Sequence, residues 1–141
     1  MIKEIPFSQL SQPDQELLLA ANEVANQAHA PYSGTLVGSA LRTKSGKIFL
    51  GANLEYAAFD SVCAERAAML SANTAGIKDV KTIALYIKKM HSEHVKPSIP
   101  CAKCRVMIMS FQKRVGQVID IISACPNMKT VYKFTVEDLM P

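Results

Sequence analysis

Residues 63–75, CAERAAMLSANTA, and residues 100–111, PCAKCRVMIMSF, decide how this chain is organised. Both stretches are rich in residues of high helix propensity, and each has a cysteine at the expected helix start. Gly76 is placed to end the first helix, and Pro100 stands directly before the second. Because the mostly apolar segment 80–87 lies between them, we expect a crossover unit in which a strand connects two helices.

Upstream of this unit, the sequence predicts a helix and then a hairpin. Ser11 is a candidate N-cap with Pro13 in the first turn, and apolar residues then recur at helical spacing. That helix is expected to end near residue 30, because Pro31 disfavours helix just before it. Strand candidates at 36–41 and 47–54 flank a Lys-Ser-Gly turn signal, which predicts antiparallel pairing.

Downstream of the unit, the sequence predicts two further strands and a short terminal helix. The strands are expected at 118–124 and 131–134, and 135–138 has the form of a capping box. The stretches 53–59 and 88–100 are expected as loops. We therefore expect an α/β protein with three layers, in which a mixed sheet of about five strands is flanked by helices on both sides.

Length and composition are those of an ordinary globular protein. The chain has 141 residues, 49% apolar and 20% charged, without repeats or a linker, so we expect a single domain over 1–141. The formal charge of +4 is scattered, and there is no Trp, which disfavours nucleic acid as a partner. The N-terminus has no signal-peptide pattern and no apolar stretch reaches ~18 residues, so we expect a cytoplasmic protein with no membrane span.

The cysteines carry the strongest chemical signal. Cys101 and Cys104 have the spacing of a pair that binds one metal ion, although a redox pair or two buried thiols share that spacing. Cys63 adds a third thiol at a predicted helix start, where the helix dipole favours the thiolate. Three ligands without an evident fourth describe an open zinc site in which water fills the last position. Glu65 lies on the same helical turn as Cys63, close enough to reach that water.

Each of these residues also has an ordinary structural interpretation. Glu65 is an acidic residue at a helix N-terminus, and Cys63 is a small residue of the kind found in cores. The joint pattern, Cys-x-Glu followed by Pro-Cys-x-x-Cys, is far more specific, because it is the signature of zinc deaminases in the version with Cys in place of His.

Further motifs accompany this signature, at 30–33 (APYS), 37–38 (VG), 51–55 (GANLE) and 135–141 (TVEDLMP). On these residues the chain resembles the small homotetrameric cytidine deaminases of pyrimidine salvage. The resemblance implies the cytidine deaminase-like fold and hydrolytic, zinc-dependent release of ammonia from free cytidine or 2′-deoxycytidine. It also implies a nucleoside and water as substrates, a homotetramer or homodimer, and neither nucleic acid nor membrane as a partner.

The resemblance implies roles at the metal centre. The ligands that it implies for one Zn²⁺ are Cys63, Cys101 and Cys104. Glu65 matches the proton shuttle, which takes a proton from water and delivers it to the ring and to the departing ammonia. Three thiolates on one zinc leave a net charge near −1, and Arg66, with Arg105 sharing the role, matches a positive residue that offsets this charge.

The resemblance also implies a substrate pocket. Asn53 and Glu55 match residues that hold the ribose hydroxyls, and the backbone of Ala64 is expected near the base. Thr35 stands where the family usually has a Phe that stacks on the base, and Phe59 is a candidate for part of the missing aromatic surface.

Other interpretations of the sequence remain open. Thr35, together with a loop before Cys63 that is one residue shorter than usual, points to a deaminase of the same chemistry acting on another amino-pyrimidine or an antibiotic nucleoside. A structural zinc protein, with Cys125 as a fourth ligand, and a polynucleotide deaminase are two further alternatives. His91 and His94 are interpreted as solvated loop residues.

Overall fold

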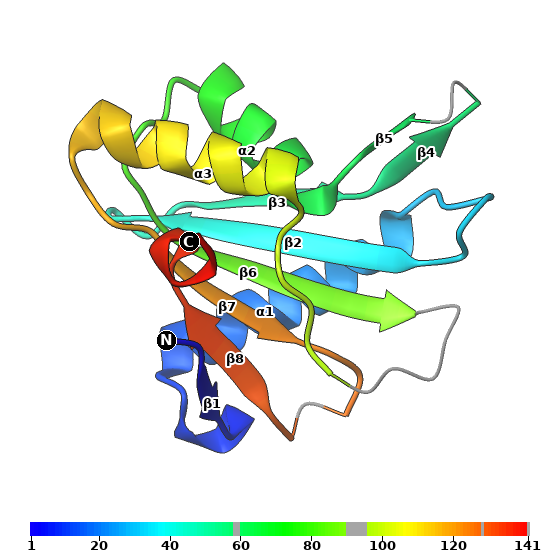
Figure 1. The fold of residues 1–141 in the computed structure, drawn as a ribbon, viewed down its shortest axis with the longest axis horizontal. Coiled ribbons are helices and arrows are strands. Elements are labelled where there is room, and N and C mark those ends of the chain that lie inside the picture. The colour runs from blue at the N-terminus through cyan, green and yellow to red at the C-terminus, as the bar shows by residue number, and fades with distance from the viewer. Residues whose placement is uncertain (58–59, 90–95, 128, 141) are drawn as a thin grey trace.

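A six-stranded mixed sheet forms the centre of the protein (Figure 1). The structure is a computed structural model, and it describes residues 1–57, 60–89, 96–127 and 129–140. The strand order is β1-β8-β7-β6-β2-β3, in which β6 and β7 run parallel and the other neighbours run antiparallel. The strands are β1 (Lys3–Ile5), β2 (Leu36–Thr43), β3 (Ile48–Ala52), β6 (Val80–Lys89), β7 (Asp120–Ala124) and β8 (Val131–Phe134).

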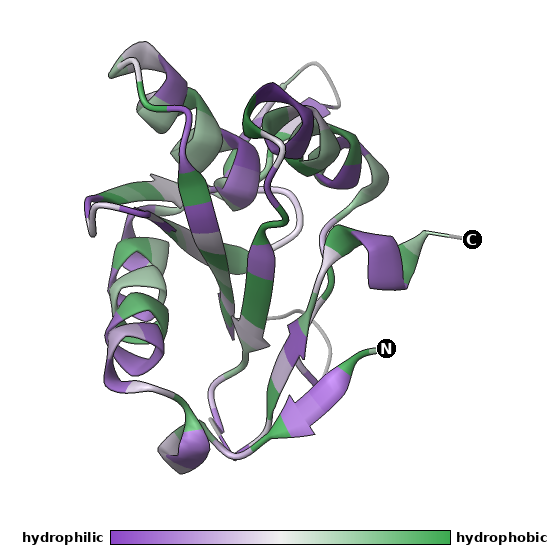
Figure 2. Cartoon of the chain, turned by 90° about the vertical axis from the view of Figure 1, so that its left-hand side faces the viewer, coloured by the Kyte–Doolittle hydropathy of each residue, from purple (hydrophilic) through white to green (hydrophobic). Residues whose placement is uncertain are grey.

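Helices cover both faces of this sheet, as Figure 2 shows. Helix α1 (Gln12–Val24) lies on one face, and helices α2 (Ala64–Thr74) and α3 (Ala102–Val115) lie together on the other. Neighbouring strand residues alternate between two buried clusters: Ala40 and Ala84 pack with α1, whereas Leu41 and Ile83 pack with α2 and α3. The expected α/β fold, a mixed sheet between two helical layers, is therefore confirmed.

The helix ends follow the local signals of the sequence. Ser11 Oγ accepts a hydrogen bond from the backbone N–H of Asp14, and α1 is continued by a 3₁₀ turn, η2 (Ala25–Gln27). Helix α3 runs four residues beyond the expected end at residue 111, because it stops where Gly116 adopts a left-handed conformation with φ of 65°. The terminal helix is a 3₁₀ turn, η3 (Val136–Leu139), with the expected capping box.

Two further features differ from the sequence prediction. The segment expected as a loop over 53–59 contains strand β4 (Leu54–Tyr56), which pairs with β5 (Asp60–Val62) in a separate two-stranded hairpin. Strand β1 adds a sixth strand beside β8, and a 3₁₀ turn, η1 (Phe7–Gln9), follows it. The three added strands, β1, β4 and β5, have three residues each, and they form through pairing with a partner rather than through propensity of their own.

Close backbone approach fixes the start of helix α2 over strand β3. A Cβ atom at Gly51 would lie 2.4 Å from the carbonyl oxygen of Ala64 and 2.4 Å from the amide nitrogen of Ala68. Glycine at this position therefore allows the first turn of α2 to rest directly on the sheet. The same turn carries the residues of the candidate site.

Across the part of the chain that the structure describes, the helices are all too short or too polar to span a bilayer.

Candidate active site

Two helix N-termini bring three thiols together. Cys63 is the N-cap residue of α2 and Cys101 the N-cap residue of α3, while Cys104 lies in the first turn of α3. The Sγ atom of Cys101 lies 3.5 Å from that of Cys63 and 3.5 Å from that of Cys104. All three sulfur atoms lie within 4.8 Å of one another.

The donor set fits zinc. A tetrahedral zinc with Zn–S bonds of about 2.3 Å places its sulfur ligands about 3.8 Å apart, close to the separations seen here. Among the described residues the group consists of these three thiols, and these residues leave a fourth position open. Cys125, which follows β7, is not part of the group, so it does not close the site as a fourth ligand.

The site favours the thiolate form of Cys63. Interaction with the Cys104 thiol is the main reason that the pKa of Cys63 is lowered to about 5, and it outweighs burial with help from Cys101 and Arg66. The pKa of Cys104 is raised, because its proton is shared with Cys63 and its side chain is buried. The N-termini of α2 and α3 add their dipoles to the same effect.

Glu65 is the buried acid of this site. It is the second residue of α2, with only 5% of its surface exposed, and it lines the same pocket as Cys63 and Cys101. Burial raises the pKa of Glu65 to about 7, and the charge of Cys63 adds to the shift. The structure therefore places a carboxyl group beside the thiols, as the sequence predicts.

Arg66 and Arg105 support the ligands in different ways. Arg66 donates from Nη2 to the carbonyl oxygen of Ser61 at 2.6 Å, which ties the start of α2 to strand β5. Desolvation lowers the pKa of Arg66, but the charges of Cys63 and the other thiols outweigh it, so that the pKa is raised. Arg105 donates from Nε to the carbonyl oxygen of Pro100 at 2.8 Å, so it fixes the backbone just before Cys101.

A pocket of about 230 Å³ opens over these groups. The residues expected from the sequence that line it are Thr35, Asn53, Glu55, Cys63, Ala64, Glu65 and Cys101. Leu85 and Ile87 of β6 also line it and were not expected as site residues. They lie toward the carboxyl end of β6, which runs parallel to β7. Ligands commonly bind at this end of parallel strands in α/β proteins, so the position of the two residues in the strand could have predicted them as part of the pocket.

Asn53 and Glu55 shape the loop that borders the pocket. Asn53 accepts a hydrogen bond from the N–H of Val37 at 2.8 Å and donates to the carbonyl oxygen of Thr35 at 2.9 Å. Glu55 Oε1 accepts from the N–H groups of Tyr32 and Ser33, both at 3.0 Å. Each side chain keeps hydrogen-bonding capacity beyond these contacts, since a carboxylate has a second oxygen and an amide has a second N–H.

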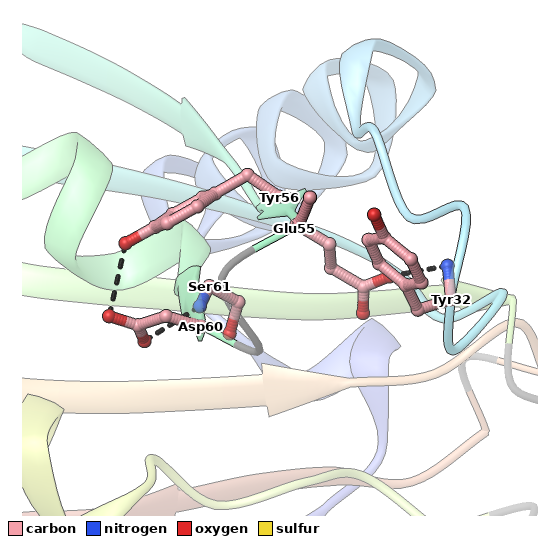
Figure 3. A pocket seen from close by; sticks show the side chains of 6 residues that line it. Tyr32, Glu55, Tyr56, Asp60 and Ser61 are labelled. Carbon is pink, nitrogen blue, oxygen red and sulfur yellow. Dashed lines mark hydrogen bonds between the residues drawn. The ribbon is translucent and has the colours of Figure 1, made fainter.

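Three residues discussed from the sequence lie outside the described residues: Phe59, His91 and His94. The hairpin that precedes the site adds others that sequence reasoning missed, namely Tyr56, Asp60 and Ser61 (Figure 3). Tyr56 and Asp60 are cross-strand partners in the hairpin, so their proximity depends on a register that the sequence did not predict.

Comparisons with known proteins agree with this geometry. The family described as the cytidine and deoxycytidylate deaminase zinc-binding region matches residues 11–119. A cytidine deaminase of Sporosarcina psychrophila is 36% identical over 100 residues, which cover 70% of each chain. A blasticidin-S deaminase of Bacillus cereus is 34% identical over 137 residues, covering 94% of this chain and 92% of its own. The crystal structure of a cytidine deaminase from Burkholderia pseudomallei superposes with a TM-score of 0.77 at 30% identity, covering 94% and 98% of the two chains.

The fold, the three converging thiols and these matches define a zinc-dependent hydrolase that removes an amino group. The chain belongs to the cytidine deaminase family.

Proposed function

We propose that this enzyme hydrolyses free cytidine and 2′-deoxycytidine to uridine and 2′-deoxyuridine, with release of ammonia. The observation that carries the proposal is the burial of the Glu65 carboxyl group in the pocket that Cys63 and Cys101 also line. An acid held beside a three-thiol metal site, with a position left open for water, has the parts that this hydrolysis needs.

Each residue has a defined task in this proposal. Cys63, Cys101 and Cys104 hold the zinc, which supplies Lewis-acid activation of water near neutral pH. The Glu65 carboxylate takes one proton from the attacking water and passes it to N3 of the cytosine ring. It then takes the second proton from the new C4 hydroxyl group and delivers it to the departing amino group. Water adds at C4, the C4–N bond breaks, and the products are uridine and ammonia.

The positive charge of Arg66 has a separate task. Three thiolates carry three negative charges and Zn²⁺ carries two positive ones, so a net charge near −1 remains. This net negative charge weakens the activation of water. The charges of Cys63, Cys104 and Cys101 raise the pKa of Arg66. Its hydrogen bond to the carbonyl oxygen of Ser61 holds Arg66 in place. We assign it the role of offsetting that charge, while Arg105 keeps the backbone before Cys101 in place.

The sugar end of the pocket supports a nucleoside in preference to a nucleotide. Asn53 and Glu55 border this end, and the second N–H of Asn53 and the remaining lone pairs of the Glu55 carboxylate suit hydroxyl groups. The carboxylate of Glu55 repels a phosphate, so a 5′-nucleotide is disfavoured here. Ala64 is assigned to the base through its backbone, and its side chain is fully buried.

A second candidate substrate has specific support. Thr35 lines the pocket where the family usually carries an aromatic ring, so the surface that stacks on the base is reduced. Base stacking on an aromatic side chain is worth about 1–3 kcal/mol. The relative named as a blasticidin-S deaminase matches over 94% of this chain. A cytosine nucleoside antibiotic is therefore the alternative substrate for the same chemistry.

We also propose that the enzyme works as one catalytic domain over 1–141, assembles as a homotetramer or homodimer, and acts in pyrimidine salvage in the cytoplasm. Leu70 of α2 and Val106 of α3 are 50% and 58% exposed, and burial between subunits would remove these two apolar side chains from water. Three reduced thiols that bind metal are typical of a reducing compartment.

A substrate panel tests the proposal. Ammonia release by the zinc-loaded enzyme is measured with cytidine, 2′-deoxycytidine, cytidine 5′-monophosphate, blasticidin S and a cytidine-containing oligonucleotide. We expect both nucleosides to be deaminated, with a much lower kcat/KM for the nucleotide and none for the oligonucleotide. Turnover of blasticidin S alone selects the second candidate. Failure of every compound to release ammonia rejects the proposed function.

A further inference from the structure

A second pocket adjoins the sugar end of the active site. It has a volume of about 420 Å³, and its lining residues are Tyr32, Glu55, Tyr56, Ala57, Asp60 and Ser61 (Figure 3). Glu55 and Ser61 also line the active-site pocket, so the two pockets meet at these residues. This second pocket can therefore hold a group attached to the sugar on the side away from the base.

The lining of this pocket combines aromatic rings with carboxylates. Figure 3 shows the Glu55 carboxylate beside the ring of Tyr32 at one end, and the Asp60 carboxylate at the other. The hydroxyl group of Tyr56 donates to Asp60 Oδ2 at 3.0 Å, which fixes that carboxylate within the hairpin. Tyr32 and Tyr56 are 67% and 41% exposed, so their rings are accessible to a ligand. Aromatic faces and carboxylates attract the same class of ligand, an organic cation.

Both carboxylates are held in the charged form. Hydrogen bonds with Ser33 are the main cause of the lowered pKa of Glu55, and the backbone N–H of Ser61 is the main cause of the lowered pKa of Asp60. Lys103 Nζ lies 3.9 Å from Asp60 Oδ1, but Lys103 does not line the pocket and this ion pair is exposed, so it screens Asp60 weakly. The pocket therefore presents two carboxylates to a ligand, and the positive charges of Lys103 and Arg66 act on one of them, Asp60.

Resting on the proposed deamination of nucleosides, we infer that this pocket binds an amine or guanidinium group carried by the sugar of a cytosine nucleoside. The base then lies at the metal centre, the sugar lies at Asn53 and Glu55, and the cationic group lies between Tyr32, Tyr56 and Asp60. The enzyme is thereby selective for the charge of its substrate, with cationic nucleosides preferred over neutral ones and anionic ones turned over least.

The test compares three substrates that differ in charge at one position: 5′-amino-5′-deoxycytidine, cytidine and cytidine 5′-carboxylic acid. We expect kcat/KM for the amine to exceed that for cytidine by about tenfold, mainly through a lower KM. An exposed ion pair and a cation–π contact together supply a preference of this size. The ratio of kcat/KM for the amine to kcat/KM for cytidine should fall toward one in Asp60→Asn and in Tyr56→Leu. Glu23→Gln is the matched control, because Glu23 is an exposed acid on α1, on the opposite face of the sheet.

A measurement on the wild-type enzyme accompanies the variants, so that the test does not depend on their folding. Raising the salt concentration from about 0.05 M to about 0.5 M should reduce the preference for the amine, because exposed charges are screened. Cytidine turnover without preference for the amine overturns this inference and leaves the proposed function intact. An amine preference that Asp60→Asn and salt both leave unchanged also overturns it. Failure to deaminate any of the three compounds rejects the proposed function, and the inference with it.

Discussion

Cys63 and Cys101 cap two different helices, α2 and α3, and their Sγ atoms lie 3.5 Å apart. Chain segments 38 residues apart thus supply thiols to one point, and Cys104 completes the group from the first turn of α3. This arrangement leads to the first prediction, which concerns the metal.

Replacing the buried ligand should empty the site. In Cys104→Ala we expect zinc content to fall from about one ion per chain to near zero, because two thiols cannot retain the metal against dilution. Elemental analysis of the dialysed protein measures this directly. Cys125→Ala removes a buried thiol outside the group and should keep its zinc. Full zinc in Cys104→Ala would contradict the assignment of the ligands.

Arg66 should control the reactivity of the centre. We expect Arg66→Gln to lower kcat about 10- to 100-fold, the usual effect of removing a residue that supports metal ligands. Arg66→Lys keeps the charge but loses the planar donor that reaches Ser61. Its kcat should therefore lie between the values of the wild type and of Arg66→Gln. Steady-state kinetics on zinc-loaded protein separates the three enzymes. Equal kcat values would show that the charge of Arg66 plays no part in the reaction.

Gly51 should be required for the position of α2. A methyl group there meets the backbone of Ala64 and Ala68 at 2.4 Å, so Gly51→Ala should lower the free energy of unfolding by about 1–3 kcal/mol. It should also weaken zinc binding, because the displaced turn carries Cys63. Gly46→Ala strains a turn with φ of 90° but leaves open space around the new methyl group, so it should reduce stability without loss of zinc affinity. Calorimetry and zinc titration of both variants test the distinction.

Glu55 should contribute to stability in a pH-dependent way. Its pKa is lowered in the folded protein from an ordinary value of 4.5, so the charged form is stabilised by folding. That contribution is present above pH 4.5 and is lost as the pH falls through the lower folded-state pKa. The melting temperature of Glu55→Gln should therefore lie below that of the wild type at pH 7, and the difference should shrink on acidification below pH 4.5. A difference that grows in acid would contradict the hydrogen bonding assigned to Glu55.

The sequence predicted those features that depend on local chemistry. The capping of α1 by Ser11, the stop of α2 near Gly76 and the hairpin of β2 and β3 follow from residues close together in the chain. The metal ligands followed from a specific pattern of residue types. In each case the signal and its structural consequence lie within a few residues, or within a known signature.

The features that the sequence did not predict depend on contacts across the fold. Strand β1 has three residues and is defined by its pairing with β8. Leu85 and Ile87 are apolar residues of a buried strand, and nothing in the segment itself separates a pocket wall from a core. The contact between Tyr56 and Asp60 depends on the register of a hairpin whose first strand lies in the segment expected as loop.

The central claim is that Glu65 moves the protons of the reaction while the thiols hold the zinc. Glu65→Gln keeps the size and the hydrogen bonding of the side chain but removes its ability to carry a proton. The most direct measurement determines zinc content and the rate of ammonia release from cytidine for this variant and the wild type. We predict unchanged zinc and a loss of kcat of about 100- to 10,000-fold. A variant that keeps both its zinc and its activity would contradict the account.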